Sequence, residues 1–149
     1  MGQPTYFGSA LRTGSDTLSD STDGGYVVVM QTATVTTVAA GTAVSATLKL
    51  PAGSQILNIF IDQVQNEVVG GGTATAINAT VGTAAAGTQY VSATDVIGGG
   101  RAALSFTAAQ LLAMANIGTN TNVVFTIAPD GTISTTQGIY RISVVYAQK

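Results

Sequence analysis

The sequence predicts an all-β protein, an antiparallel two-sheet sandwich of jelly-roll-like form with one short helix and an extended N-terminal arm. Three observations support this fold class: short runs rich in β-branched residues, glycine-containing turns at roughly 8–12-residue spacing between those runs, and a single segment of helical periodicity. The chain has 149 residues, which is about the length of one domain. A core of that size needs neither disulfides nor a metal to be stable.

The first 25 residues are predicted to form a flexible arm, and residues 26–149 the sandwich domain. The stretch Gly2–Gly25 is rich in Gly, Ser, Thr and Asp and shows no sustained hydrophobic period, so it cannot bury enough apolar surface to order itself. It nevertheless contains Tyr6, Phe7 and Leu11, which a purely solvated tail would not need. We therefore expect these three residues to act as interface anchors.

The first half of the domain contains three predicted strands. One begins at Tyr26 with YVVVMQTATVTTV, and a second is SATLKL, where Ala46, Leu48 and Leu50 share one face. Pro51 and Gly53 predict a turn. The run QILNIFIDQVQ follows, with Leu57, Ile59 and Ile61 on one face and Ile56, Phe60 and Val64 on the other. Because this third strand is apolar on both sides, we place it centrally.

The second half alternates shorter strands with turns. Glycine-bounded pieces lie around ATAINATVG and QYVSATDVI, and two stronger strands, NVVFTIA and IYRISVVYA, flank a Pro129-Asp130-Gly131 turn. The alternation in all these strands predicts the following core residues: Leu48, Leu50, Leu57, Ile59, Ile61, Val123, Phe125, Ile127, Ile142 and Val144.

One segment, RAALSFTAAQLLAMANIG, predicts a short helix over residues 107–116. Thr107 and Gln110 have the Thr-x-x-Gln spacing of a capping box, and Gly118 lies where a helix C-cap is expected. Four apolar residues fall on one face at i, i+3, i+4 and i+7, namely Ala108, Leu111, Leu112 and Ala115. The helix is expected to lie over an open edge or end of the sheets.

The composition excludes several classes of function. The chain has no cysteine and no histidine, which removes disulfides, thiolate nucleophiles, imidazole bases and the usual zinc ligands. Only 8% of residues are charged, the net charge is -2, and no basic cluster occurs, so nucleic-acid binding is not expected. No secretory signal and no apolar run of about 18 residues is found, so we expect a soluble protein made inside the cell, with no membrane partner.

No catalytic, cofactor-binding or metal-binding residue is predicted. The triplets Gly70–Gly72 and Gly98–Gly100 are not followed by Lys-Ser or Lys-Thr, so they are interpreted as turn glycines rather than phosphate-binding loops. The acidic set Asp16, Asp20 and Asp23 lacks the spacing of a calcium loop, although a weak ion site there remains an alternative. Asp62, Glu67, Asp95 and Asp130 have no local signature of a glycosidase pair.

The tyrosines are interpreted as packing residues. Tyr26, Tyr90, Tyr140 and Tyr146 lie at or inside predicted strands, where cross-strand packing explains them better than a sugar-binding face. Enzymatic activity is therefore the least favoured of the functional hypotheses.

The order of these segments resembles the small jelly-roll capsid decoration (cement) proteins of tailed bacteriophages. The resemblance covers roughly Tyr26–Lys149, from VVVMQTATVTTVAAGTAVSATLKLPAGSQILNIFIDQVQ to the closing GIYRISVVYAQK. Its best element is a strand ending in Leu50-Pro51-Ala52-Gly53 followed two residues later by a long apolar strand.

This resemblance implies a structural virion protein on the capsid exterior, assembled in the host cytoplasm. It would bind the major capsid protein across capsomer junctions as a homotrimer, with no cofactor, and the arm would dock on a neighbouring subunit or on the capsid floor. The low charge suits a surface that becomes buried. The alternative is a carbohydrate-binding or fibre/tail module on the virion surface.

Overall fold

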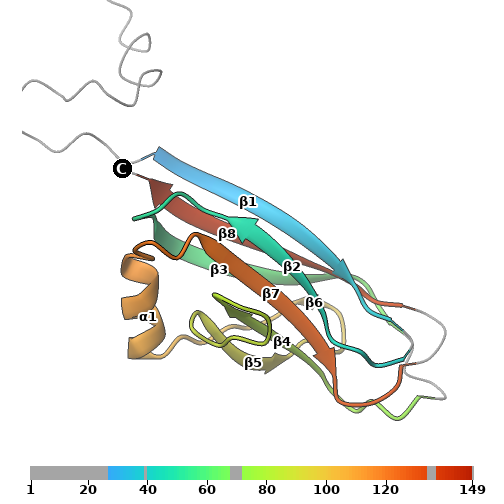
Figure 1. Cartoon of the computed structure of the whole chain (residues 1–149). Coiled ribbons are helices and arrows are strands. Elements are labelled where there is room, and N and C mark those ends of the chain that lie inside the picture. The colour runs from blue at the N-terminus through green and yellow to red at the C-terminus, as the bar shows by residue number, and fades with distance from the viewer. Residues whose placement is uncertain (1–26, 39, 68–71, 134–136, 149) are drawn as a thin grey trace, which may run out of the picture.

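The computed structural model describes residues 27–38, 40–67, 72–133 and 137–148. Eight strands within them form two four-stranded antiparallel sheets that pack face to face, with one helix at the side (Figure 1). The predicted two-sheet sandwich is therefore confirmed. The elements are β1 (Val27–Thr36), β2 (Val44–Lys49), β3 (Gln55–Gln65), β4 (Ile77–Gly82), β5 (Val91–Asp95), β6 (Gly100–Arg101), α1 (Ala108–Ala115), β7 (Asn122–Pro129) and β8 (Ile139–Gln148).

The strand order is that of a jelly roll. Sheet A has the order β1-β8-β3-β6, and sheet B has the order β2-β7-β4-β5. The first strand thus pairs with the eighth, the second with the seventh, the third with the sixth and the fourth with the fifth, as if one long hairpin had been rolled into two sheets. This order puts the start of β1, the start of β3 and the end of β8 together, since Val27 pairs with Gln148 and Gln55 with Ala147.

The core lies between the two sheets. Ile61, Phe125 and Tyr140 are completely buried there, and nine of the ten predicted core residues are buried. Leu57 is the exception, because 46% of its surface is exposed. A β-bulge between Ile56 and Asn58 inserts Leu57 as an extra residue in the pairing of β3 with β8, so that Ile56 occupies the inward position that strict alternation assigned to Leu57.

Helix α1 begins as predicted but buries another face. Thr107 and Gln110 form the expected capping box: the Thr107 Oγ1 accepts from the Gln110 amide at 3.2 Å, and the Gln110 side chain accepts from the Thr107 amide at 2.9 Å. The helix buries Gln110 and Met114, whereas the predicted inner residues Leu111 and Leu112 are exposed. The C-cap is Asn116, whose side chain accepts from the amide of Gly118.

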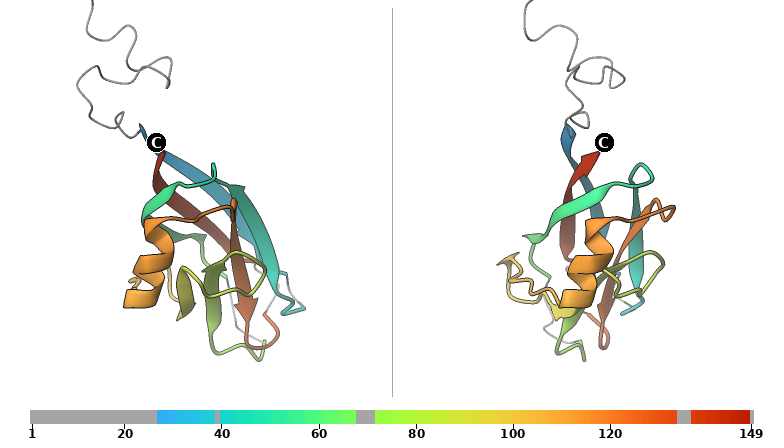
Figure 2. Two further views of the ribbon diagram at one scale, coloured as in Figure 1. Left: turned by 60° about the vertical axis from the view of Figure 1, so that its left-hand side comes forward. Right: turned by 90° about the vertical axis from the view of Figure 1, so that its left-hand side faces the viewer.

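The orientation of α1 follows from contacts distant in sequence. The Gln110 side-chain amide donates to the Thr88 carbonyl at 3.2 Å and to Ser92 Oγ at 2.9 Å, so this polar residue must face the sandwich. After the helix, Ile117 donates its amide to the Ser54 carbonyl at 3.0 Å, which ties the chain to the turn before β3. The right-hand view in Figure 2 shows α1 standing across that end of the sandwich, which we call the helix end.

The connections contain one strand that the sequence did not predict. The two-residue β6 pairs with Asp62 and Gln63 of β3, and the preceding turn has positive φ angles of 104° at Gly98 and 88° at Gly99. These angles favour glycine, which agrees with the interpretation of this triplet as turn residues. Residues 68–71 lie outside the described parts, as does the predicted arm, Gly2–Gly25.

Candidate interaction surface

The acidic residues of the domain serve local structure. Asp130 accepts from Thr75 Oγ1 at 2.6 Å and from the backbone amides of Thr75 and Ala76, which holds the pKa of its carboxyl below the usual value. Asp95 accepts from the amides of Ile77 and Ile97. In the parts of the chain that the structure describes, no three acidic, histidine or cysteine side chains gather as metal ligands would.

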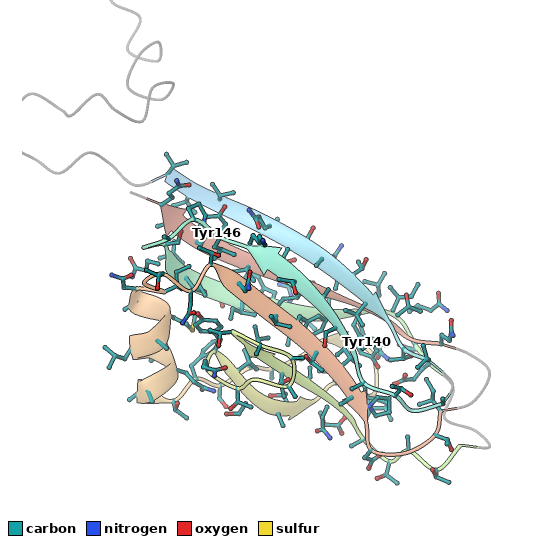
Figure 3. The ribbon with its side chains drawn as sticks, viewed as in Figure 1. Tyr140 and Tyr146 are labelled. Carbon is teal, nitrogen blue, oxygen red and sulfur yellow. The ribbon has the colours of Figure 1, made fainter. Side chains whose placement is uncertain are left out.

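A buried polar cluster joins three strands at the end of the sandwich opposite α1. Tyr140 of β8 donates its hydroxyl to Glu67 Oε1 at 2.7 Å and accepts from Gln63 Nε2 at 2.9 Å, while Thr37 Oγ1 donates to Glu67 Oε2 at 3.2 Å. Burial, aided by the bond to Glu67, raises the pKa of the Tyr140 hydroxyl. Figure 3 shows Tyr140 near this end and Tyr146 near the helix end of the same strand. The cluster links β3 and β8 to the segment that follows β1, and Gln63 Oε1 within it is buried without a hydrogen-bond partner among the described residues.

Sheet B has its outer face partly covered by the connection from β4 to β5. Ala86 of this connection donates its amide to Thr126 Oγ1 at 3.0 Å, and the outward-facing Thr126 and Val124 of β7 are buried beneath it. Gly82 permits the close approach, because a Cβ at this position would lie 2.7 Å from Gly87 Cα.

Sheet A, in contrast, presents a broad outer face, which we call the open face. It is formed by the outward side chains of β1, β8 and β3, since the inward side chains of these strands fill the core. The face is mainly small, β-branched or apolar, and its members are Val28, Met30, Thr32, Thr34, Thr36, Arg141, Ser143, Val145, Asn58, Phe60 and Asp62. A face of this chemistry can be covered at little desolvation cost.

One charged row crosses the open face. Asp62 accepts from Arg101 Nε at 2.8 Å and from Arg141 at 3.3 Å, and the bond to Arg101 is the main reason that the pKa of Asp62 is lowered. The Arg101 guanidinium also lies 4.5 Å from the centroid of the Phe60 ring. The row has one carboxylate for two guanidinium groups, and both arginine side chains are about half exposed.

Exposed apolar side chains concentrate at the helix end. Leu112 is 77% exposed and Leu111 is 53% exposed on α1, and Leu57 lies at the start of β3 beside the chain that leaves the helix. Val27, Val28 and Met30 occupy the start of β1, which lies at the same end of the sandwich as α1 but is separated from it by other strands (Figure 1). Exposed apolar side chains that gather into a patch are typical of a contact with another macromolecule.

The predicted anchors cannot be compared with this surface, because Tyr6, Phe7 and Leu11 lie outside the described residues. The tyrosines predicted to be packing residues are buried at positions 90, 140 and 146. The exposed face of α1 was not predicted to be exposed, although the apolar stripe through Leu111 and Leu112 is visible in the sequence. Such an apolar stripe is normally assigned to the face that packs against the core. No residue near α1 in the sequence indicates that Gln110 faces the core in place of the leucines.

No family model matches the chain, and no curated protein matches its sequence. A solved structure does match: a chain of the structure described as "Cyanophage Pam1 capsid asymmetric unit" superposes with a TM-score of 0.57 at 20% sequence identity. The match covers 95% of this chain and 99% of that one. The two chains therefore share a fold over nearly their whole lengths.

Proposed function

We propose that this protein is a structural component of a phage virion that decorates the capsid exterior and binds the major capsid protein across capsomer junctions. The observation that supports the proposal is the end-to-end match with a chain of the Pam1 capsid asymmetric unit. Because the match includes nearly all of both chains, the likeness extends over the whole described domain and is not confined to one sheet. The same proposal includes a homotrimer on the capsid, without catalytic activity and without a cofactor.

The surface described above suits this role. A decoration protein needs a surface that can be buried against the capsid or a neighbouring copy. The open face suits such burial because it combines threonines and apolar side chains with a single charged row. The acidic side chains of the described strands and turns accept hydrogen bonds from arginines, hydroxyls or backbone amides. The α1 helix has eight residues and, among the described residues, no helix is long enough to cross a membrane.

We place the helix end against the capsid. Val27, the first described residue, lies at this end, so the predicted anchors Tyr6, Phe7 and Leu11 and the exposed leucines of α1 would approach the same partner. Apolar anchors of this kind contribute most when they become fully desolvated in a contact.

The alternative role is a carbohydrate-binding or fibre/tail module on the virion surface. Sugar-binding faces use exposed aromatic rings, and Tyr90, Tyr140 and Tyr146 are buried in this domain. The decoration role is therefore the better supported of the two.

The direct test is the amount of the chain on intact heads. Purified phage particles are analysed by quantitative mass spectrometry, and the ratio of this chain to the major capsid protein is measured. For a decoration protein, we expect the number of copies to equal that of the major capsid protein or to be a constant simple fraction of that number. A few copies per particle would instead favour the fibre or tail role, and absence from the particle would refute a virion role.

The contact surface is tested with heads that lack the protein. Recombinant chain is added back, and bound protein is measured by sedimentation with the heads. Leu112→Glu should reduce binding without changing the melting temperature, whereas the matched control Thr119→Glu, also exposed but polar in the native chain, should bind as the unmodified chain does. Deletion of Met1–Asp23 should weaken binding as well; equal occupancy would show that the arm is passive.

A further inference from the structure

Strand β1 forms an edge of sheet A that lacks the usual protection against strand pairing. It has ten residues, VVVMQTATVT, with no charged residue, no proline and no glycine. It pairs with β8 over its whole length without a register shift, and no described residue forms a backbone hydrogen bond with its other side. A long edge strand of this kind is a template for another strand.

The other three edge strands each have features that hinder pairing with a further strand. Strand β2 is six residues long and contains Lys49. Strand β5 has five residues, ends in Asp95 and pairs with β4 through a register shift. Strand β6 has two residues, one of which is Arg101. Short length, charge and bulges are the devices that keep edges from pairing, so their absence is specific to β1.

We infer that β1 pairs with β1 of a second copy of this chain, antiparallel about a two-fold axis, so that the two A sheets become one continuous sheet. This contact deepens the role proposed above, where copies lie side by side on a capsid. A two-fold contact joins copies in pairs and cannot by itself form a trimer. The β1 contact is therefore independent of the proposed trimer, and it can join either two monomers or two trimers.

The sequence of β1 is self-complementary in this arrangement. With Thr32 on the axis, Thr32 faces Thr32 of the second copy, Met30 faces Thr34, and Val28 faces Thr36. Outward residues meet outward residues, so the open faces of both sheets remain continuous. Threonine and apolar cross-strand pairs are favourable, and no like charges are brought together. Val28 and Met30, which are 59% and 61% exposed in the single chain, would be partly covered by the threonines beside them.

The charge-swap experiment tests this pairing. Thr32 is exposed, so Thr32→Lys and Thr32→Asp should each leave the fold and the melting temperature unchanged. In the pair, each substitution places two like charges across the axis, whereas mixing the two variants places opposite charges there. Thr47→Lys and Thr47→Asp serve as matched controls, because Thr47 is an exposed, outward-facing residue of the short edge strand β2.

We expect the unmodified full-length chain to sediment as an even number of copies. The mass should fall twofold in each Thr32 variant, return in their equimolar mixture, and stay constant in both Thr47 variants. An odd number of copies in the unmodified chain, or a Thr32→Lys mass equal to the unmodified one, would overturn the inference.

Deletion of Met1–Asp23 separates this arrangement from an edge covered by the N-terminal segment of the same chain. The β1 pairing predicts the same even mass with and without the deletion. Even copies that appear only after the deletion would show that the segment itself occupies the edge, and the inference would then be wrong.

Discussion

Two neighbouring apolar residues of β3 should differ sharply in their contribution to stability. The sequence pattern assigned Leu57 and Ile59 to the same inner face, but the bulge leaves Leu57 46% exposed while Ile59 is only 2% exposed. Replacing each by alanine removes a similar amount of hydrocarbon. The comparison therefore isolates the effect of the bulge from the effect of side-chain chemistry.

The expected magnitudes follow from burial. Ile59→Ala removes buried carbon atoms and leaves a cavity between the sheets, which costs about 2–5 kcal/mol of the free energy of unfolding. At roughly 2–4 °C per kcal/mol for a chain near this length, the melting temperature should fall by about 4–20 °C. Leu57→Ala loses only about half of a burial contribution that is about 1.5–3 kcal/mol when complete, so it should cost roughly 1 kcal/mol.

The assay is urea unfolding followed by circular dichroism, with both variants measured beside the unmodified chain. An equal loss of stability for the two variants would refute the position of the bulge. An unchanged midpoint for Ile59→Ala would refute the assignment of the core itself.

Three further outcomes are expected. Stability should fall as the pH rises above about 10, by up to about 1.4 kcal/mol per pH unit for each such group, because the unfolded chain releases the Tyr140 proton that the folded chain retains; Tyr140→Phe should reduce this slope in unfolding titrations. Glu67→Gln should cost about 1–3 kcal/mol in urea, since the two hydroxyls donate to different carboxylate oxygens and the amide nitrogen that replaces one of them cannot accept. Gly82→Ala should cost about 1–3 kcal/mol and speed amide exchange at Ala86, because its Cβ displaces the covering loop.

Local residue choice was enough to predict where every element except the two-residue β6 lies. The β-branched runs, the Pro51–Gly53 turn and the Thr107–Gln110 capping box depend on neighbours within a few residues, and each is found at its predicted place. The composition alone also shows that the chain has no cysteine, no histidine and few charged residues.

The tertiary structure decided which sides of these elements are inside. Leu57 is exposed because β3 must keep register with β8, a strand about 90 residues later in the chain. Leu111 and Leu112 are exposed because the Gln110 side chain finds its partners at Thr88 and Ser92, which lie 22 and 18 residues earlier in the chain. Strand β1 is an edge because the chain rolls up with its first strand outside its last. Periodicity identifies an apolar face, but only the contacts between distant segments determine whether that face meets the core or the solvent.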